Sequence, residues 1–388
     1  MTATLSRRAF LIGCSAAASP LLSPVTFAAA PGDKRLVVIL LRGAMDGLDM
    51  VRPRGDAGFA ALRPRLALDL AASADLDGYF ALHPAAAPLL PLWQAGEMAF
   101  VQAVATPYRR GRSHFIAQDA LENGTGGDDG QMTASRDGWL NRALSLIPGA
   151  RPDLAVSVGQ ERLLILDGPQ QTSHWFPVEQ SPLSSQGQAL LAALHHADPL
   201  FARPYDAAVA LALATSDQKP AGSDLSHKAL GTHVAERLQA EARIASFSIG
   251  GWDMHQNQVK TMTERLHALA QTLLALKSGL GSAWGSTLVL AMTEFGRTVR
   301  ENGSGGTDHG TGGMLIALGG MVRGGRVLGD WPGIGADDLL GERDLLPTGD
   351  LRRYPAWALR SLFGVGAAGL ETVVFPGLDL QGDPGLIL

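Results

Sequence analysis

Short runs of almost uninterrupted apolar residues recur along the chain and end at polar or glycine-rich segments. Such runs are typical of strands in a parallel sheet, which helices bury on both faces. The pattern predicts strands at residues 35–41, 98–104, 154–158, 163–166, 244–249, 287–292 and 314–318. We therefore expect an α/β fold with a mostly parallel central sheet.

Segments in which apolar residues recur at helical spacing lie between these strands. They predict helices at residues 225–242 and 259–276, with further helix starts near residues 138 and 350. The sequence thus alternates strands and helices, as an α/β protein does.

Residues 181–215 are rich in alanine and leucine, and two prolines interrupt their helical spacing. We interpret this stretch as part of a helical insertion near residues 181–242. The best linker candidate, residues 219–224, is too short to define a domain boundary. The predicted organisation is a single α/β domain over residues 31–388.

The composition supports a sizeable core and excludes several classes of protein. Of 388 residues, 46% are hydrophobic and only 6% are aromatic, and glycine occurs 47 times. These values favour a loop-rich α/β enzyme over a helical bundle. A formal net charge of −5 gives no basic footprint for binding nucleic acid.

Residues 1–30 have the features of an export signal. Arg7 and Arg8 precede a weakly apolar, alanine-rich stretch that ends with three alanines at 28–30. A positive start, an apolar middle and an A-x-A site make a secretory signal peptide, and paired arginines mark the twin-arginine route. The expected partner is therefore the twin-arginine export machinery, and the expected location is periplasmic or secreted.

Export changes what the mature chain can rely on for stability. Cys14 is the only cysteine, so the mature chain forms no disulfide and depends on its core. Pro20 and Pro24 break the short apolar run of the signal, which argues against a stable membrane anchor. Proteins on this route are exported already folded, so a metal acquired in the cytoplasm can travel with the chain.

Polar side chains follow four of the predicted strands, and a glycine-rich loop after the last of them carries two more. In chain order these residues are Asp46, Ser113, Asp253 with His255, Glu294, and Asp308 with His309. Ligands of open parallel sheets bind beyond the carboxyl ends of the strands, so we expect these groups at one edge. Carboxylates and imidazoles bind divalent metal ions. The sequence therefore predicts a metal site there.

Each of these residues also has an ordinary structural interpretation. Asp46 suits an Asx turn or a helix cap, and Ser113 stands at a predicted helix start, where serine is a common N-cap. The segment 294–310 has the composition of a solvated loop. The arginines at 109–112 suit either a solvated face or a rim that attracts anions.

Specific short motifs carry a family resemblance. They are SHF at 113–115 with QD at 118–119, GWL at 138–140, GWDMH at 251–255, TEFGR at 293–297 and GTDHG at 306–310. On these motifs nearly all of the mature chain resembles a bacterial domain-of-unknown-function family of twin-arginine-exported proteins. That family is in turn distantly similar to the alkaline phosphatase and sulfatase superfamily, which implies a three-layer sandwich around a mostly parallel sheet.

The distant similarity also implies roles for individual residues. Asp46 would be the carboxylate after the first strand, and Ser113 would correspond to the metal-activated nucleophile. The ligands of one metal ion would be Asp253, His255 and His309. Glu294 would stand where the superfamily has an Asp-His pair.

Phe295 departs from the superfamily, because phenylalanine cannot bind metal where a histidine is expected. Two fully ligated zinc ions are therefore not expected. An oxygen-rich second site built from Asp46, Ser113 and Glu294 would suit magnesium, calcium or manganese better.

The resulting functional hypothesis is an exported, metal-dependent hydrolase of phosphate or sulfate esters, with a small anionic ester as substrate. A metal would lower the pKa of the Ser113 hydroxyl, while Arg297 or His114 would hold the anion. The alternative is a non-catalytic exported protein that binds metal or a ligand in the cell envelope. A sugar hydrolase with Asp and Glu pairs ranks last, since no aromatic-lined groove is evident.

Overall fold

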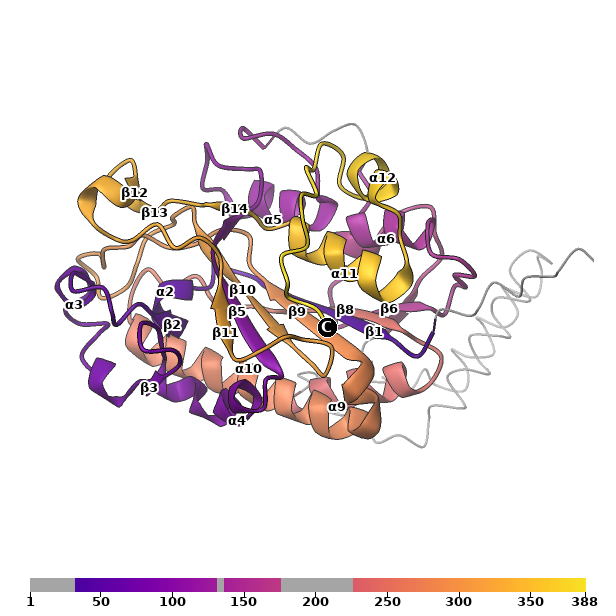
Figure 1. Ribbon diagram of the computed structural model, residues 1–388, viewed down its shortest axis with the longest axis horizontal. Coiled ribbons are helices and arrows are strands. Elements are labelled where there is room, and N and C mark those ends of the chain that lie inside the picture. The colour runs from indigo at the N-terminus through magenta and orange to yellow at the C-terminus, as the bar shows by residue number, and fades with distance from the viewer. Residues whose placement is uncertain (1–31, 131–135, 176–225) are drawn as a thin grey trace, which may run out of the picture.

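The computed structural model describes residues 32–130, 136–175 and 226–388 (Figure 1). At its centre lies a nine-stranded sheet, in which β14 (Gly349–Asp350) pairs with β5 beside the main path. The strands of that path, in spatial order, are β11 (Arg326–Leu328), β5 (Met98–Ala105), β10 (Gly313–Leu318), β9 (Thr287–Met292), β1 (Arg35–Leu41), β8 (Ile244–Ile249), β6 (Ala155–Val158) and β7 (Ser173–Trp175).

All but one of these strands run in the same direction. Strand β1 pairs in parallel with β8 and β9, and β5 pairs in parallel with β11 and β14. Strand β10 is antiparallel to both of its neighbours, β5 and β9. The carboxyl ends of β1, β5, β8 and β9 therefore meet at one edge of the sheet, and β10 begins at that edge.

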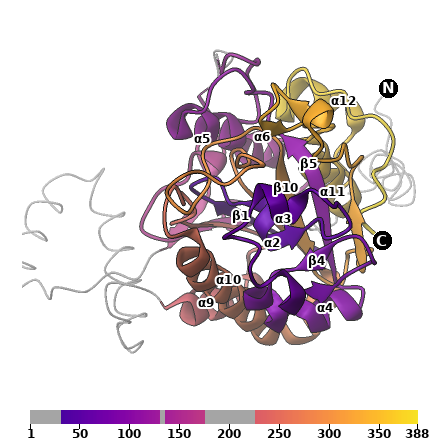
Figure 2. The same cartoon turned by 90° about the vertical axis from the view of Figure 1, so that its left-hand side faces the viewer.

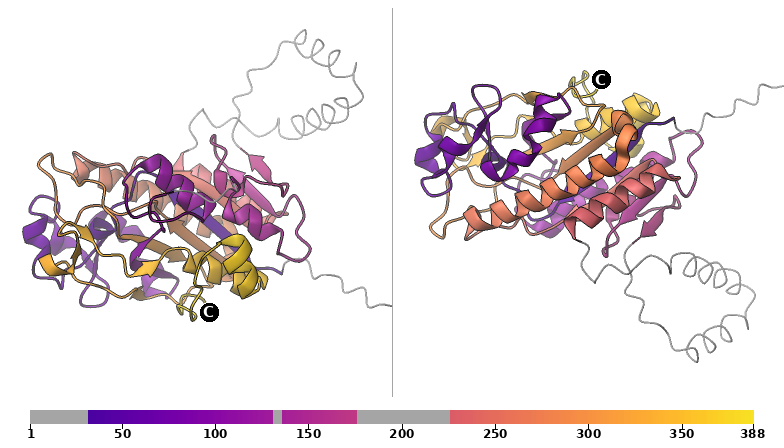
Figure 3. Two further views of the ribbon diagram at one scale, coloured as in Figure 1. Left: turned by 90° about the horizontal axis from the view of Figure 1, so that it is seen from above. Right: turned by 90° about the horizontal axis from the view of Figure 1, so that it is seen from below.

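Helices cover both faces of the sheet (Figure 1). One layer contains α5 (His114–Asn123), α6 (Trp139–Leu144) and α11 (Arg353–Phe363), and the other contains α4 (Leu90–Gln94), α9 (His227–Gln239) and α10 (Gln258–Leu280). Seen from below, α9 and α10 run side by side across the sheet (Figure 3). The chain is thus a three-layer α/β sandwich with a mostly parallel sheet, as the resemblance implied.

The alternation of side chains along β1 explains the two cores. Leu36 and Val38 pack with the helices on the α6 and α11 side, while Val37 and Ile39 pack on the α9 and α10 side. Successive residues of a strand point to opposite faces, so a strand covered on both sides must be apolar throughout. All seven residues of β1 are buried.

Short elements frame the carboxyl edge of the sheet. They are α2 (Gly47–Met50), α3 (Phe59–Leu62), the hairpin β12 (Leu339–Leu340) and β13 (Asp344–Leu345), and the small sheet β2 (Val51–Arg52), β4 (Ala81–Leu82) and β3 (Ala74–Asp75). Turned to face that side, α2 and α3 lie in front of the sheet, between α5 above and α10 below (Figure 2).

The structure confirms every predicted strand except residues 163–166. There the chain forms a 3₁₀ turn, Leu164–Leu166, and the Ile165 amide donates to the Glu122 carboxylate at 3.0 Å. Leu163, Ile165 and Leu166 are all buried. A short apolar run reports burial, and burial alone does not distinguish a strand from a buried turn.

The predicted helices at 225–242 and 259–276 correspond to α9 and α10, and α10 extends to Leu280. Helix α9 packs against α10 in the layer that covers the sheet. Residues 181–215 and the linker at 219–224 lie outside the described residues. Within the described part of the chain, no helix has both the length and the apolar character needed to cross a membrane.

Candidate metal-binding site

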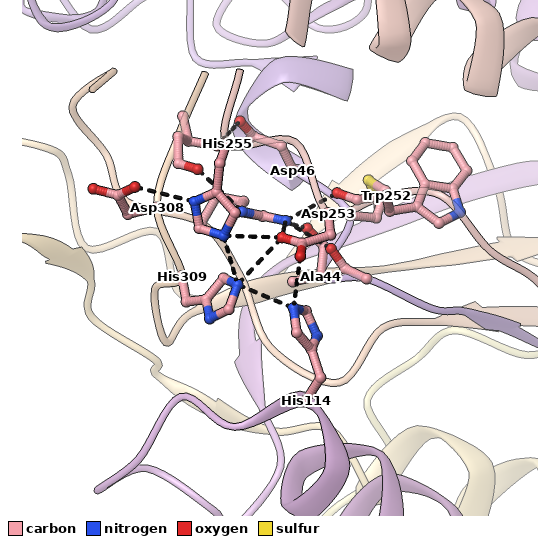
Figure 4. Close-up of polar contacts among 12 residues, drawn as sticks. Ala44, Asp46, His114, Trp252, Asp253, His255, Asp308 and His309 are labelled. Atoms are coloured by element: carbon pink, nitrogen blue, oxygen red, sulfur yellow. Dashed lines mark hydrogen bonds and ion pairs between the residues drawn. The ribbon is translucent and has the colours of Figure 1, made fainter. Parts of the chain in front are cut away.

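Two loops and the start of one helix bring four side chains together at the carboxyl edge of the sheet. Asp253 and His255 follow β8, His309 precedes β10, and His114 is the first residue of α5. These four residues point toward a common centre (Figure 4). We call them the donor group, because their nitrogen and oxygen atoms are of the kind that donate electron pairs to a metal ion. Because β10 is antiparallel, the residues before it reach the same edge as the residues after β8.

The three imidazoles approach one another through their Nε2 atoms. His309 Nε2 lies 3.0 Å from His114 Nε2 and 2.9 Å from His255 Nε2. Asp253 Oδ1 lies 3.2 Å from His309 Nε2 and 3.1 Å from His255 Nε2. Its Oδ2 lies 3.4 Å from His114 Nε2. Three ring nitrogens and one carboxylate thus converge.

The opposite ring nitrogen, Nδ1, of each histidine has its own acceptor. The contacts are 2.8 Å from His114 Nδ1 to Glu294 Oε1, 3.1 Å from His255 Nδ1 to Asp308 Oδ1, and 2.9 Å from His309 Nδ1 to the carbonyl oxygen of Arg112. Ionised carboxylates and carbonyls only accept hydrogen bonds, so each Nδ1 carries the proton. The same arrangement orients metal-binding histidines in known sites.

This tautomer leaves three Nε2 lone pairs facing one another. Two neutral imidazole acceptors at 2.9 or 3.0 Å repel each other unless a proton or a cation lies between them. The Asp253 carboxylate adds negative charge at the same point. The donor group is therefore built to hold a positive charge.

The pKa values of two of these imidazoles shift in opposite directions. The hydrogen bond to Glu294 raises the pKa of His114, because it favours the protonated ring. Burial lowers the pKa of His309, because it disfavours a charged ring. Without a metal, the first proton added to this pair therefore goes to His114.

Arg297 fixes the carboxylate of Asp253. Its Nη2 donates to Asp253 Oδ1 at 2.6 Å. Burial alone would raise the pKa of Asp253, but the hydrogen bond and the charge of Arg297 outweigh it and lower that pKa to about 2. Asp253 is therefore ionised at neutral pH.

The position of Arg297 corrects its sequence interpretation as an anion-binding residue. The side chain has no exposed surface, and its guanidinium faces inward. Besides Asp253, it donates to the carbonyls of Gly43, Ala44, Trp252 and Thr307. Arg297 is a positioning residue that ties together the loops after β1 and β8 and the loop before β10.

Glu294 stands two residues after β9, as predicted, but it lies behind His114. Its buried Oε1 accepts from the Gly43 amide at 2.8 Å and from Gln118 at 3.2 Å, and Oε2 accepts from Thr293. Burial alone would raise the pKa of Glu294, but these hydrogen bonds, led by that of His114, lower it. The Glu294 carboxylate therefore contacts Nδ1 of His114 and does not face the converging Nε2 atoms.

Asp308 has the same relation to His255. Its Oδ1 also accepts from Asn302 Nδ2 at 3.1 Å, and the Asn302 side chain donates to the His255 carbonyl at 2.8 Å. The hydrogen bond from Asn302, followed by that of His255, lowers the pKa of Asp308. Asn302 thus holds both the acceptor and the backbone of His255.

Asp46 lies apart from the donor group, as the helix-cap interpretation predicted. It caps α2 by accepting from the amides of Leu48 and Asp49. Both of its oxygens also accept from Arg63, at 2.8 and 3.2 Å, and Gln258 donates to Oδ2 at 2.7 Å. Hydrogen bonds from other protein groups therefore satisfy the carboxylates of both Asp46 and Glu294. The two do not form the oxygen-rich second site expected from the sequence.

Ser113 occupies the N-cap position of α5, but its side chain makes no capping hydrogen bond. Its backbone amide donates to the Tyr108 hydroxyl at 3.4 Å. The Ser113 hydroxyl therefore accepts no hydrogen bond from the backbone N–H groups of the first turn of α5. Both the hydroxyl and this turn adjoin His114. A simple capping role does not describe this serine.

Phe295 is buried and packs against two of the imidazoles. Its ring centroid lies 5.0 Å from those of His114 and His309. Phe295 thus supports the orientation of the donor group.

Two glycines permit the close approach of the loops. A Cβ on Gly43, whose φ is +115°, would lie 2.5 Å from the Asp253 backbone nitrogen, and one on Gly306 would lie 2.3 Å from the Met254 carbonyl oxygen. Residues with a Cβ would force these backbones apart.

Sequence reasoning missed three features of the site. It gave His114 an anion-binding role, whereas the structure places its Nε2 in the donor group. It also missed Gln118 and Asn302, which hold the acceptors of His114 and His255. The signal that was available for His114 is its place beside Ser113 at the end of a strand-to-helix loop.

The protein is thus an α/β sandwich with a mostly parallel sheet and a candidate metal site at the carboxyl edge of that sheet. A family model described as "Protein of unknown function (DUF1501)" matches residues 103–367, and the chain belongs to this family. The match includes all four donor residues and leaves Asp46 outside. It confirms the family resemblance seen in the sequence motifs.

Solved structures with similar folds include members of the alkaline phosphatase superfamily and sulfatases. One is a protein in the alkaline phosphatase superfamily from Vibrio parahaemolyticus, with 13% identity, coverage of 92% of this chain and 71% of that one, and a TM-score of 0.39. Another is the PsFucS1 sulfatase from Pseudoalteromonas sp., with 12% identity, coverage of 99% and 78%, and a TM-score of 0.41. A third is Ps i-CgsB in complex with k-i-k-neocarrahexaose, with 10% identity, coverage of 88% and 74%, and a TM-score of 0.44. No curated protein sequence matches the chain.

Proposed function

We propose that this protein is an exported, metal-dependent hydrolase of phosphate or sulfate esters. The observation that carries the proposal is the convergence of three Nε2 atoms and the Asp253 carboxylate beside the start of α5. A protein has little reason to hold such repelling groups together unless a cation binds there.

The donor set fits a transition metal better than an alkaline-earth ion. Imidazole nitrogen with one carboxylate suits zinc and its neighbours, whereas magnesium and calcium prefer oxygen ligands. His114, Asp253, His255 and His309 would hold the ion. Once bound, such an ion polarises an ester oxygen and lowers the pKa of a nearby hydroxyl. The sequence-based expectation of magnesium, manganese or calcium concerned a second site, which Asp46 and Glu294 do not form.

The chain itself supplies the groups that would meet the ester. Ser113 adjoins His114, and its hydroxyl is not used as a helix cap. The uncapped first turn of α5 presents backbone N–H groups, which favour an anion such as phosphate or sulfate. We assign Ser113 as the nucleophile and the start of α5 as the holder of the anion.

Export and location form part of the same proposal. The paired arginines and the A-x-A site at residues 28–30 support cleavage after a twin-arginine signal. The signal lies outside the described residues. The mature protein would work in the periplasm or outside the cell.

Two matched serine variants and one ligand variant test the proposal. Ser113→Ala should abolish turnover across a panel of phosphate and sulfate esters with almost no change in melting temperature. Ser226 does cap a helix, because it accepts from the Ala229 amide at 3.2 Å. Ser226→Ala should therefore cost about 1 kcal/mol of stability and leave turnover unchanged.

Asp253→Ala should reduce bound metal well below the wild-type content, as measured by elemental analysis of the folded protein. Unchanged metal content in this variant would contradict the assignment of the donor group. A wild-type protein that binds metal stoichiometrically but hydrolyses no ester would instead support the non-catalytic alternative.

A further inference from the structure

Asp344, the first residue of β13, carries a buried carboxylate that the proposed site does not use. Its side chain has no exposed surface, and three side chains donate to it. Oδ2 accepts from Arg112 Nη2 at 2.7 Å and from Thr311 Oγ1 at 2.8 Å, and Oδ1 accepts from Arg343 Nη1 at 2.7 Å. These donors come from the loop after β5, the loop before β10 and the hairpin itself. Asp344 therefore joins three segments of the carboxyl edge.

All three partners of Asp344 lie next to His309. The Arg112 carbonyl accepts from His309 Nδ1 at 2.9 Å. Arg343 uses the same Nη1 to donate to the His309 carbonyl at 2.9 Å. Thr311 stands two residues after His309. Through one residue each, Asp344 thus reaches the ring, the carbonyl and the following backbone of this histidine.

His309 depends on such support more than the other two imidazoles of the donor group. His114 and His255 donate through Nδ1 to side-chain carboxylates, whereas His309 donates to a backbone carbonyl. A carbonyl on a loop keeps its place only as well as the loop does. Among the described residues, the ion pair of the Arg112 side chain is with Asp344. That pair anchors the segment that carries the acceptor of His309.

The hairpin that carries Asp344 is tied to the same edge of the sheet by its backbone. The Val299 amide donates to the Arg343 carbonyl at 3.2 Å, and the Gly312 amide donates to the Leu345 carbonyl at 3.0 Å. Leu345, the other residue of β13, is fully buried. Asp344 therefore stands on a fixed support from which its carboxylate can hold its three donors.

We propose that Asp344 is a positioning residue for His309. By holding the acceptor of Nδ1 and the His309 backbone, it keeps Nε2 of that ring turned toward the donor group. The outer partners of metal-binding histidines fix the orientation of those rings in this way. The inference rests on the proposed metal site for its effect on metal affinity, but the orientation of His309 is measurable without metal.

The first test is NMR of the metal-free mature protein with isotope-labelled histidine. It measures how fast the Nδ1 proton of His309 exchanges with water, and His309→Gln identifies the signal by its loss. Asp344→Asn should speed this exchange about tenfold, because the carbonyl that accepts the hydrogen bond is no longer anchored. The Nδ1 proton of His114, whose acceptor is a buried carboxylate, serves as the internal reference.

The second test is zinc affinity at pH 7.5. Asp344→Asn should weaken binding about tenfold, at the lower end of the range for outer partners of a ligand, because it acts through other residues. Arg112→Gln should weaken binding less, since Arg343 still holds Asp344. If Asp344 acts through Arg112, the double variant should bind zinc no more weakly than Asp344→Asn alone.

A second buried carboxylate provides the matched control. Glu122 lies about two turns beyond His114 on α5, is buried, and pairs with Arg42 at 2.5 Å. Glu122→Gln removes a buried charge, as Asp344→Asn does, and should also lower the free energy of unfolding. It should leave the exchange rate of His309 and the zinc affinity as in the wild type. The control thus separates a positioning role from a merely structural one.

Several outcomes would overturn the inference. They are an unchanged exchange rate of His309 in Asp344→Asn, additive effects of Asp344→Asn and Arg112→Gln on zinc affinity, or equal effects of Glu122→Gln. If Asp344→Asn does not fold, an unchanged exchange rate in Arg112→Gln, at a half-exposed position, would do the same. A wild-type protein that bound no zinc would sink the metal proposal, while faster exchange in Asp344→Asn would still support the positioning of His309.

Discussion

Glu294→Gln tests whether the carboxylate behind His114 tunes the donor group. The substitution keeps the shape of the side chain and removes its charge. In the wild-type protein, His114 Nδ1 donates to the charged Oε1 of Glu294 at 2.8 Å, and this oxygen also accepts from Gly43 and Gln118. After the change, His114 keeps at most a neutral acceptor, so its Nε2 becomes a weaker electron donor.

The expected magnitude follows from this geometry. Removing a carboxylate that orients a metal-binding histidine typically lowers metal affinity 10-fold to 100-fold, which corresponds to about 1.4–2.7 kcal/mol. We expect the upper half of that range, because Glu294 is fully buried and water cannot replace it. The free energy of unfolding of the metal-free protein should also fall, by about 1–3 kcal/mol, because the new amide group faces existing donors.

Metal affinity is measured at pH 7.5 by competition with a chromogenic zinc chelator, on protein shown to be folded by circular dichroism. Glu97→Gln is the control, since Glu97 precedes β5 at the opposite edge of the sheet and pairs with Lys277. The control should bind zinc like the wild type. If Glu294→Gln bound zinc within twofold of the wild type, Glu294 would not support a metal-binding His114.

Two further predictions concern pH and export. Burial lowers the pKa of His233 on α9 from 6.5 to about 4, and its ring stacks on Trp175. Its contribution to stability is complete above pH 6.5 and is lost as the pH falls toward 4, by at most about 3 kcal/mol. His233→Phe keeps the stacking, so urea unfolding should show a shallower pH slope between 4 and 6.5; an unchanged slope would contradict this assignment. Replacing Arg7 and Arg8 together with lysine should leave unprocessed precursor in the cytoplasm, and mature protein outside the inner membrane of fractionated cells would refute the twin-arginine route.

The sequence predicted the strands well because a strand covered on both faces must be apolar at every position. It did not predict the direction of β10. Residues 314–318 are as apolar as the parallel strands, since both of their faces are also buried. Yet this direction decides the site, because an antiparallel β10 begins at the carboxyl edge and thereby brings His309 there.

The proximity of the site residues could be predicted where they lie close in sequence and could not be predicted where they lie far apart. Asp253 and His255 were expected to converge, and His255 Nε2 lies 3.1 Å from Asp253 Oδ1. The sequence did not reveal that Glu294 would face Nδ1 of His114. That pairing joins a strand end to a helix start 180 residues away, and only the packing of α5 on the sheet establishes it.

Asp46 supports the loops that carry the donor group without contacting the donor group itself. Gln258 donates to Asp46 at 2.7 Å and accepts from the Thr307 hydroxyl at 2.8 Å. Gln258 begins α10 three residues after His255, and Thr307 stands two residues before His309, so this chain of bonds fixes both histidine loops from behind.

The ion pair with Arg63 compensates the buried negative charge of Asp46. The negative charge that faces the centre of the donor group therefore comes from Asp253, whose carboxylate Arg297 also holds. Two buried arginines thus support the site: Arg63 compensates Asp46, and Arg297 holds the carboxylate of Asp253. Replacing either arginine should disturb metal binding without removing a residue of the donor group.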